Sequence, residues 1–512
     1  MRLLHTRTDL LHWRQQAADA PLHFVPTMGA LHAGHQSLIR RAAASPAGRT
    51  ARVLVSVFVN PLQFGPSEDF EHYPRTLAAD AQLAAAAGAE ALFAPSVAEL
   101  YPDGDAELTR LQPPASLQRG LCGARRPGHF DGVATVVARL LGLIRPDALL
   151  LGEKDWQQLV ILRRVVADLG LPVQVIGCRT QREADGLALS SRNRYLSAEQ
   201  RQQAAALPRA LMAARRQRSA TPGQLVAQVT AELASTGLVV DYVEAVDPHS
   251  LQPAAQLRGL TLLAAAAHCG PSRLIDHVFL MSRQPIVAID GPAGAGKSTV
   301  TRAFAEQLGL IYLDTGAMYR AVTWLVQRSG ADPSDAHAVA AQLENLNLEL
   351  STSALGAQRV SVNGHDVTDA IRSPEVTGQV SVVAAHGCVR EALTRQQQAM
   401  GERGGLVAEG RDIGTAVFPD ADLKVFLTAT VAERARRRAH DLEQRGFAVP
   451  DLSELEAQIA ERDHLDSTRA VAPLTQAADA VEVVTDGMAI AAVIERLLSL
   501  FRERVPEDAW PG

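Results

Sequence analysis

The sequence has little cysteine: Cys122, Cys178, Cys269 and Cys388 stand far apart and form no C-x-x-C pair. This spacing argues against a disulfide framework or a structural zinc site and is typical of a reducing compartment. Long apolar runs are missing too, and none approaches the ~18 residues needed to cross a bilayer. The first residues, MRLLHTRTDLLHWRQQ, mix charged and apolar side chains, which does not fit a signal peptide. We therefore expect a cytoplasmic protein with no membrane association.

An excess of positive charge is also missing. The chain has 50 lysines and arginines against 56 aspartates and glutamates, a formal net charge of −6, which is the wrong sign for general nucleic-acid binding. Hydrophobic residues make up 47% and charged residues 21%, so the chain is expected to fold rather than stay disordered. Its 512 residues exceed what one hydrophobic core usually serves, so more than one domain is expected.

The first part of the chain alternates short apolar runs with longer helical patterns. Residues 22–26, 53–59 and 148–152 are typical of buried strands, and residues 77–87 of a helix between them. This alternation predicts an α/β fold with a parallel sheet covered by helices. From about residue 184 the pattern changes to helices followed by strands at 239–246 and 260–268, which predicts a smaller α+β lobe.

A second β-loop-α pattern begins at Pro285, where the apolar run 285–290 leads directly into a glycine-rich loop and a helix. A new unit of this kind so late in the chain predicts a second domain after the short junction 281–284. We expect the tail 502–512 to be frayed. The predicted domains are 1–283, with a Rossmann-like part at about 1–183 and a lobe at about 184–283, and 284–512.

The segment PTMGALHAGHQSL (26–38) follows a predicted strand, opens a helix and contains His32-x-Gly34-His35. Two histidines three residues apart at a helix start lie on one face, and the helix N-terminus attracts phosphate. This arrangement suits the attack of a carboxylate on the α-phosphate of ATP, which needs positioning and charge neutralisation rather than a general base. The alternative is that the two histidines only cap or pack a helix.

Further polar strings follow other predicted strands. Asn60 and Gln63 come after the second strand, the glycine-punctuated loop 126–137 precedes a helix, and LGEKDWQQL (151–159) and READGLALSSRN (182–193) carry charged and hydroxyl groups. Ligands of open α/β sheets bind at the carboxyl ends of the strands, where these segments are expected to converge.

Together these strings, with HCGPSRLIDHV (268–278), resemble the pantothenate synthetase family over residues 1–283. The resemblance implies a Rossmann-like nucleotidyltransferase of the H-I-G-H type with a small lid lobe, using ATP and Mg²⁺ to join pantoate to β-alanine, usually as a homodimer. It implies that His35 is a proton donor, that Lys154 and Arg192 offset the charge of the leaving pyrophosphate, and that Asp80 helps to hold Mg²⁺. Gln63 and Gln158 are expected to bind pantoate, with Gln63 next to β-alanine. The implied ATP contacts are Met28, Gly29, Ala30, Leu31, His32, Ala33, Gly34, His35, Gly152, Glu153, Lys154, Asp155, Gln181, Leu189, Ser190, Ser191 and Arg192.

The second domain begins with a full match to the phosphate-binding pattern G-x-x-x-x-G-K-[ST] between a strand and a helix. Backbone N–H groups of such a loop surround the phosphates of ATP, the lysine reaches the β/γ oxygens, and the serine binds Mg²⁺. The expected ATP-binding residues are Gly291, Pro292, Ala293, Gly294, Ala295, Gly296, Lys297, Ser298 and Thr299, with Lys297 catalytic and Ser298 the metal ligand.

The phosphoryl acceptor has to be inferred from other segments. YLDTGAMYRAV (312–322), SVVAAHGCVREAL (381–393), AEGRDIGTAVFPDA (408–421) and ERDHLDSTRAVAPL (461–474) supply arginines suited to bidentate phosphate contact. These strings resemble cytidylate kinase across residues 285 to about 500. The resemblance implies CMP and dCMP as acceptors and a lid in which Arg434 and Arg437 contact phosphate. The implied CMP contacts are Thr315, Arg320, Ser381, Arg390, Arg411, Asp412 and Arg469, with Asp412 accepting from the cytosine amine that uracil lacks.

Two alternatives to a pair of enzymes stay open. One half of the chain could be a non-catalytic binding or oligomerisation module, although His35, Lys154, Arg192, Lys297 and Asp412 are all present. Both halves could instead act on other substrates, namely a different acyl acid and UMP. The glutamines expected at pantoate and the residues expected at cytosine argue against that reading.

Overall fold

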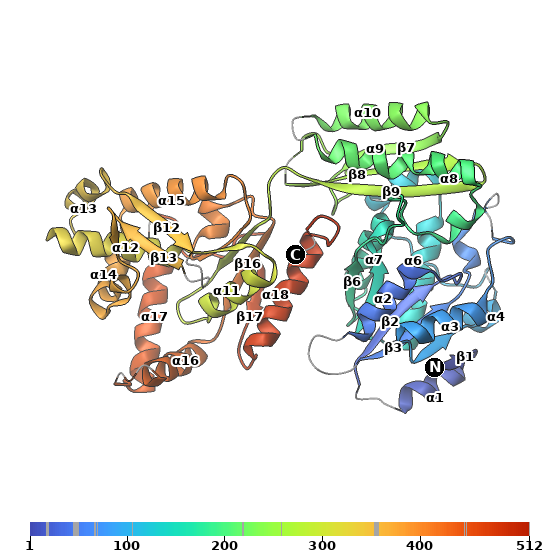
Figure 1. Ribbon diagram of the computed structural model, residues 1–512. Coiled ribbons are helices and arrows are strands. Elements are labelled where there is room, and N and C mark those ends of the chain that lie inside the picture. The colour runs from blue at the N-terminus through green and yellow to red at the C-terminus, as the bar shows by residue number, and fades with distance from the viewer. Residues whose placement is uncertain are drawn as a thin grey trace. The chain divides into compact units, whose positions relative to one another are not determined.

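The structure is a computed structural model that describes residues 1–510 except residues 17–19, 45–50, 66, 67, 69, 105, 218, 219, 258, 353–357, 445, 447 and 470. The described chain divides into two compact units (Figure 1). Met1–Ser282 together with residues 505–510 form unit 1, and Arg283–Arg504 form unit 2. Among the described residues, none of the helices is both long and apolar enough to cross a membrane.

Unit 1 is built on a parallel sheet with the strand order β1-β4-β3-β2-β5-β6. Its chain runs outward from β2 to β3 and β4, then returns to add β5 and β6 on the other side of β2. The loops after β2 and β5 therefore diverge, and this switch in strand order is where ligands bind in open α/β sheets. The strands are β1 (Arg2–Leu4), β2 (Leu22–Thr27), β3 (Arg52–Val57), β4 (Ala91–Phe93), β5 (Ala148–Gly152) and β6 (Gln174–Cys178).

Both faces of this sheet are buried because successive side chains of a strand point to opposite faces. Val53 and Val55 pack with helices α2 and α3 in one core cluster, whereas Leu54, between them, points to the other face and is also fully buried. The helices and 3₁₀ turns of this part are α1 (Arg7–Gln15), α2 (Ala33–Ala43), η1 (Pro61–Gln63), α3 (Leu77–Ala87), α4 (Val97–Leu100), η2 (Ala115–Leu117), α5 (Leu121–Arg125), α6 (His129–Ile144), η3 (Glu153–Asp155) and α7 (Trp156–Asp168).

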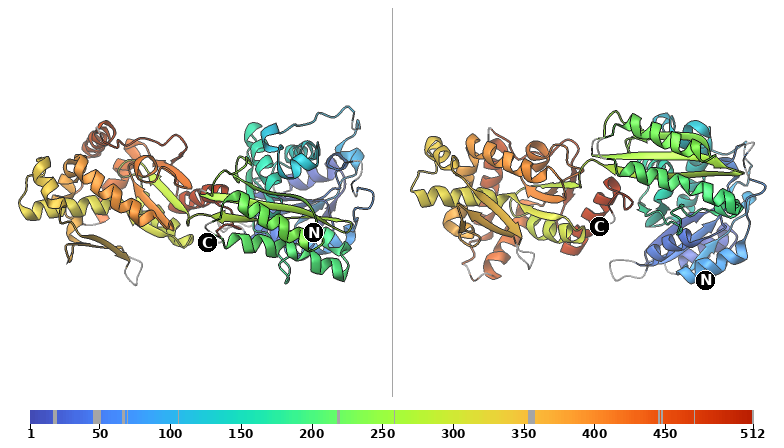
Figure 2. Two further views of the ribbon diagram at one scale, coloured as in Figure 1. Left: turned by 90° about the horizontal axis from the view of Figure 1, so that it is seen from above. Right: turned by 45° about the horizontal axis from the view of Figure 1, so that its top comes forward.

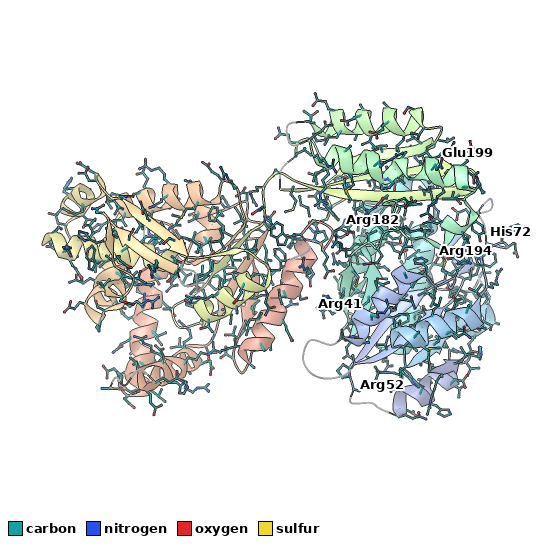
Figure 3. The ribbon with its side chains drawn as sticks, viewed as in Figure 1. Arg41, Arg52, His72, Arg182, Arg194 and Glu199 are labelled. Carbon is teal, nitrogen blue, oxygen red and sulfur yellow. The ribbon has the colours of Figure 1, made fainter. Side chains whose placement is uncertain are left out.

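The rest of unit 1 is a lobe in which helices pack on the antiparallel sheet β7-β8-β9 (Figure 2). Its own core is formed by side chains such as Leu207, Leu211 and Val229 from the helices and Leu263 from β8. Arg182, labelled in Figure 3, ties the lobe to the segment before it through two hydrogen bonds to the Asp276 carboxylate on β9. The elements are η4 (Ser191–Tyr195), α8 (Ala198–Ala204), α9 (Ala206–Arg215), α10 (Pro222–Ser235), β7 (Val239–Val246), β8 (Leu260–Cys269) and β9 (Ser272–Met281).

Unit 2 has a parallel sheet with the order β11-β15-β10-β16-β17, in which β10 leads into the glycine-rich loop. A small antiparallel sheet, β12-β13-β14, stands apart from it. The strands are β10 (Ile286–Asp290), β11 (Ile311–Asp314), β12 (Leu348–Thr352), β13 (Gln358–Val362), β14 (His365–Asp366), β15 (Leu406–Gly410), β16 (Leu423–Thr428) and β17 (Val481–Val484).

Helices surround the unit 2 sheet, and a short π-helix, η6, interrupts the chain directly after β15. Such local widening of a helix is frequent at functional sites. The helices are α11 (Lys297–Gln307), α12 (Thr315–Ser329), α13 (Ala336–Leu343), η5 (Ala370–Arg372), α14 (Pro374–Ala385), α15 (Gly387–Gly401), η6 (Ile413–Val417), α16 (Val431–Gln444), α17 (Leu452–Thr468) and α18 (Ile490–Arg504).

The predicted α/β class is confirmed, and the expected strand 148–152 and helix 77–87 form with those bounds. The expected strand 53–59 is wrong at its end, since β3 stops at Val57 and a polar loop follows. The prediction of a frayed tail is also wrong, because Val505 and Ala509 are 1% and 3% exposed.

Candidate active sites

The first candidate site is a cavity of about 280 Å³ at the switch point of the unit 1 sheet. The loops after β2, β3, β5 and β6 and the segment before η4 all reach it. Of the residues predicted from the sequence, the cavity is lined by Met28, His32, Gly34, His35, Gln63, Gly152, Lys154, Asp155, Gln158, Gln181, Leu189, Ser190, Ser191 and Arg192. Gly29, Ala30, Leu31, Ala33 and Glu153 were expected at ATP but are not among its described lining residues.

His32 and His35 form a reciprocal cap at the start of α2. The Gly34 amide donates to His32 Nδ1 at 3.1 Å, and the His32 amide donates to His35 Nδ1 at 3.3 Å. Because each Nδ1 accepts a backbone N–H, the proton of each neutral ring is on Nε2. Burial lowers the pKa of His35 to about 3, with His32 and Lys154 adding to the effect, and burial lowers the pKa of His32 to about 4. Both rings are therefore neutral hydrogen-bond donors near pH 7.

Asp80 lies beside the loop that precedes His32. Its carboxylate is 1% exposed and accepts the amides of Ala30 and Leu31 at 3.1 and 2.7 Å and the hydroxyl of Thr76. It is not among the described residues that line the cavity. Asp80 therefore fixes the backbone of the loop before His32, and its role as a Mg²⁺ ligand stays a prediction.

Hydrogen bonds from three neighbouring side chains hold Gln63 at the cavity. Its side-chain oxygen accepts from Asn60 at 3.2 Å, and its backbone oxygen lies 2.8 Å from His129 Nδ1 and 3.3 Å from the Arg126 guanidinium. Burial, followed by the charge of Arg126, lowers the pKa of His129 to about 4, so this ring is neutral and donates to Gln63. Sequence reasoning missed Arg126 and His129 as lining residues, although both belong to the loop 126–137 that it singled out.

Positively charged side chains, among them Lys154 and Arg192, also line this cavity. Lys154 lies at the end of β5, 3.6 Å from the Asp155 carboxylate, and Arg192 lies over the Tyr73 ring at 5.9 Å. Tyr73, which the sequence analysis did not select, also contacts Ser191 through its hydroxyl. Anionic groups of a bound ligand would therefore meet positive charge in the same cavity as the two imidazoles.

The second candidate site is a cavity of about 500 Å³ in unit 2, between the glycine-rich loop and helices α12, α14 and α15. All residues predicted to bind the acceptor line it: Thr315, Arg320, Ser381, Arg390, Arg411, Asp412 and Arg469. Ala293, Gly294, Lys297 and Ser298 from the loop line it as well. Gly291, Pro292, Ala295, Gly296 and Thr299 are not among its described lining residues.

Lys297 is buried and donates to the carbonyl oxygens of Gly291 and Pro292 at 2.7 and 2.8 Å. Burial, followed by the charge of Arg411, lowers its pKa well below the usual value. The phosphates of a bound nucleotide would offset that cost by supplying opposite charge. The loop needs glycine at Gly291, whose φ is 149° and where a Cβ atom would lie 2.0 Å from the Leu427 oxygen.

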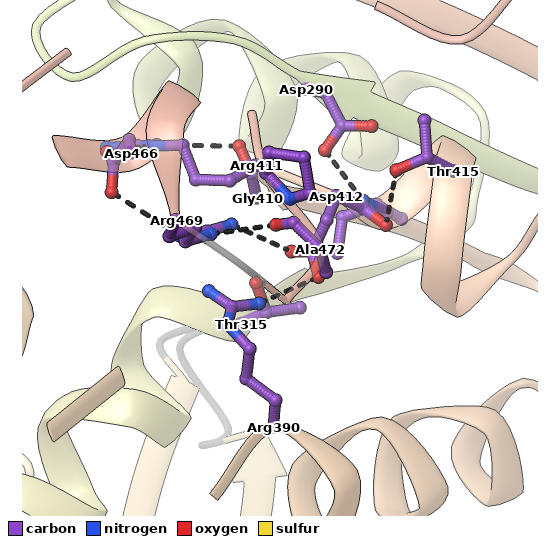
Figure 4. A network of polar contacts seen from close by, with 12 residues as sticks. Asp290, Thr315, Arg390, Gly410, Arg411, Asp412, Thr415, Asp466, Arg469 and Ala472 are labelled. Carbon is purple, nitrogen blue, oxygen red and sulfur yellow. Dashed lines mark hydrogen bonds and ion pairs between the residues drawn. The ribbon is translucent and has the colours of Figure 1, made fainter. Parts of the chain in front are cut away.

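A buried ion pair lies among the residues that line this cavity, and Figure 4 shows its contacts. Arg390 donates to Asp412 at 2.9 Å, with side chains only 4% and 5% exposed, and Arg469 lies 3.9 Å from the other carboxylate oxygen. Burial raises the pKa of Asp412, and the arginines oppose that rise. Asp290 accepts the amides of Ile413 and Gly414 at 2.8 and 2.7 Å, which holds the backbone just after Asp412.

The lid arginines contact the glycine-rich loop. Arg434 donates to the Ala293 oxygen and pairs with Asp463, and Arg437 donates to the Ala295 oxygen. Neither lines the cavity among the described residues, whereas Arg438 does. Arg434 and Arg437 thus hold backbone oxygens of the glycine-rich loop, and their contact with phosphate stays a prediction.

A switch-point cavity with paired histidines, followed by a glycine-rich loop beside an arginine-lined cavity, defines a two-site nucleotide-using enzyme. The family model for pantoate-beta-alanine ligase matches residues 2–279, and that for cytidylate kinase matches residues 287–503. The chain is 69% identical over 510 residues to the bifunctional pantoate ligase/cytidylate kinase of Parasynechococcus marenigrum, covering 99% of each. It is 66% identical over 501 residues to the protein of that name from Prochlorococcus marinus, covering 98% of this chain and 99% of the relative.

Among solved structures, the pantothenate synthetase of Thermus thermophilus is 44% identical with a TM-score of 0.50, and the match covers 54% of this chain and 99% of that one. The chain belongs to the bifunctional pantoate ligase/cytidylate kinase family.

Proposed function

We propose that unit 1 joins (R)-pantoate to β-alanine through pantoyl-adenylate, releasing AMP and diphosphate, and that unit 2 transfers the γ-phosphoryl group of ATP to CMP or dCMP. The observation that carries this proposal is that most of the residues expected at each pair of substrates line one cavity in each unit. A non-catalytic half has less support, because each cavity keeps its charged and hydrogen-bonding groups. Dimerisation through unit 1 and a cytoplasmic location stay predictions.

In the first reaction the pantoate carboxylate attacks the α-phosphorus of ATP, and pyrophosphate leaves. The neutral rings of His32 and His35 each have an Nε2–H free of the capping contacts, and donors of this kind stabilise charge that develops on phosphate oxygens. A histidine with a pKa of about 3 is not an imidazolium at neutral pH, so His35 donates a hydrogen bond rather than a proton. Lys154 and Arg192 balance the charge of the leaving group, and Gln63 and Gln158 orient pantoate.

In the second reaction an oxygen of the CMP phosphate attacks the γ-phosphorus of ATP. Lys297 supplies charge at the β/γ oxygens when ATP displaces the carbonyl groups it now contacts. Arg320, Arg411 and Arg469 face the same cavity and suit the acceptor phosphate. The Asp412 carboxylate, oriented by Arg390, keeps acceptor capacity for the cytosine amine.

The two units differ in their fit to Mg²⁺. In unit 2, Ser298 donates to Glu409 at 2.6 Å, and the other Glu409 oxygen is buried without a hydrogen-bond partner. Oxygen donors of this kind suit Mg²⁺, so Ser298 and Glu409 would hold it, where it would neutralise phosphate charge. In unit 1 the Asp80 carboxylate already accepts the amides of Ala30 and Leu31, which leaves its oxygens less free for Mg²⁺.

The test is an assay of the purified full chain with both sets of substrates. AMP formation that requires both pantoate and β-alanine is expected, together with CDP formation that requires CMP. AMP formation with other carboxylic acids at the same rate, or equal rates with CMP and UMP, would favour the alternative with other substrates. Loss of only one activity in a fully folded chain would favour a non-catalytic half.

A further inference from the structure

The C-terminal segment 505–510 is part of unit 1, although the chain reaches it only after all of unit 2. Val505 and Ala509 are almost fully buried, and the amides of Ala509 and Trp510 both donate to the Pro506 oxygen at 3.0 Å. The segment is therefore a closed turn with its own buried anchors. It is placed too firmly to be a loose end of the chain.

The turn supplies hydrogen-bond donors to a buried acid. The backbone amides of Glu507 and Asp508 donate to the two carboxylate oxygens of Glu153 at 3.0 and 2.9 Å. Glu153 is 1% exposed, and a buried carboxylate without such donors is costly. Burial, followed by the nearby Asp508 carboxylate, raises its pKa to about 7. Glu153 begins η3, directly between Gly152 and Lys154 of the cavity lining.

The same turn holds the loop after β6. The amide and the hydroxyl of Thr180 donate to the Asp508 carboxylate at 3.2 and 2.5 Å, and Arg179 lies 3.7 Å from it. Thr180 is 7% exposed and lines the candidate ligase cavity together with Gln181. One carboxylate thus accepts two hydrogen bonds from Thr180 and pairs with Arg179, both on a loop where the sequence predicts nucleotide contacts.

Two loops that border one cavity are therefore joined by a single dipeptide from the far end of the chain. We propose that the turn around Asp508 is a positioning element of the ligase site, which holds the loops after β5 and β6 in the geometry that binds ATP. This inference rests on the proposed function, because it takes the unit 1 cavity as the ATP site of the ligase. Asp508 acts through Glu153 and Thr180 and does not touch substrate.

Glu507 provides a matched control. Its side chain contacts only Arg41 among the ion pairs of the described residues, at 3.3 Å, and that arginine, labelled in Figure 3, is 58% exposed. The Glu507 side chain itself is 21% exposed, and an ion pair with one largely exposed partner contributes little. Glu507→Ala keeps the backbone amide that Glu153 needs, whereas Asp508→Ala removes the acceptor of the Thr180 contacts.

The experiment uses the full chain, with CDP formation as an internal standard on the same polypeptide. Asp508→Ala is expected to raise the KM for ATP in pantothenate formation about tenfold, the size expected for lost hydrogen bonds to a charged group, with a smaller change in kcat. Glu507→Ala should stay within about twofold of wild type. Thr180→Val, a milder change, should reproduce part of the effect, and the double variant with Asp508→Ala should be no worse than Asp508→Ala alone.

Amide hydrogen exchange without substrates separates this proposal from the proposed function. Faster exchange in residues 177–183 is expected in Asp508→Ala and not in Glu507→Ala, whereas residues 150–156 should change less because alanine keeps the backbone amide that donates to Glu153. An active chain in which Asp508→Ala changes neither the exchange nor the KM for ATP would overturn the positioning role. If the wild-type chain makes no pantothenate but residues 177–183 exchange faster in Asp508→Ala, the proposed function would be overturned while the contacts of the turn would stand.

Discussion

Gly132 lies in the first turn of α6, directly against the backbone of η1, and it is buried. A Cβ atom at this position would lie 2.2 Å from the Leu62 oxygen, 2.5 Å from the Leu62 carbonyl carbon and 2.8 Å from the Gln63 nitrogen. Non-bonded carbon contacts are comfortable at roughly 3.5 Å, so Gly132→Ala must separate the two backbones by about 1 Å. No flexible side chain is available to absorb this shift.

The displaced backbone carries Gln63, which is predicted to bind pantoate. The hydrogen bond from Asn60 to the Gly132 oxygen, 3.1 Å long, also crosses this contact and would be strained. A misplacement of about 1 Å can cost on the order of 10²-fold in rate, so kcat/KM for pantoate is expected to fall by about that factor. Overpacking costs about 1–3 kcal/mol of stability, more than the gain of up to about 1 kcal/mol from replacing a helical glycine.

Gly142 on the same helix is the matched control, because it is exposed and no atom lies within 4 Å of the Cβ that alanine would add. Gly142→Ala is expected to keep full activity and to gain about 0.5–1 kcal/mol of stability. The assay measures initial rates of pantothenate formation with pantoate varied, CDP formation on the same preparation, and thermal unfolding. Wild-type kcat/KM for pantoate and unchanged stability in Gly132→Ala would refute the close contact between α6 and η1.

Four further predictions follow from the sites. His35→Gln should slow pantoyl-adenylate formation by about 10²–10³-fold and leave CDP formation intact, and a rate near wild type would remove the ring from the mechanism. Because its folded pKa of about 3 lies below the unfolded value of 6.5, the unfolded chain takes up the proton first; stability relative to His35→Gln should therefore fall by about 2 kcal/mol from pH 7 to pH 5, and parallel unfolding curves would contradict this. Lys297→Ala should abolish CDP formation and spare the ligase, whereas joint loss in a folded chain would argue against independent sites. Asp412→Asn should narrow the preference for CMP over UMP, and an unchanged ratio would exclude Asp412 from base recognition. Expressed separately, fragment 284–512 should keep CDP formation, while fragment 1–283, which lacks the C-terminal turn, should show a raised KM for ATP; a wild-type KM in that fragment would contradict the need for the turn.

The sequence by itself determined the features that depend on neighbouring residues. The strand, glycine-rich loop and helix from Pro285 onward need only the local run of apolar residues and glycines, and the structure forms them there. The pairing of His32 with His35 could also be predicted, because residues three apart at the start of a helix lie on the same face. Residues that follow the ends of parallel strands lie at one edge of the sheet, which is why Gln63 after β3 and Lys154 after β5 reach one cavity.

Only the tertiary structure decided the roles that depend on a distant partner. Asp80 and Arg434 are charged residues on helices, and from the sequence each could equally hold a ligand or support a loop. Arg438 rather than Arg437 lines the second cavity because the packing of α16 sets which of its successive arginines faces inward. The ordered structure of the C-terminal tail could not be predicted for a similar reason. Asp508 is held by Thr180, which lies 328 positions away in the chain. Contacts between residues so far apart in the chain are fixed by burial and hydrogen bonding in the folded unit. The pattern of neighbouring residues in the sequence contains no information about them.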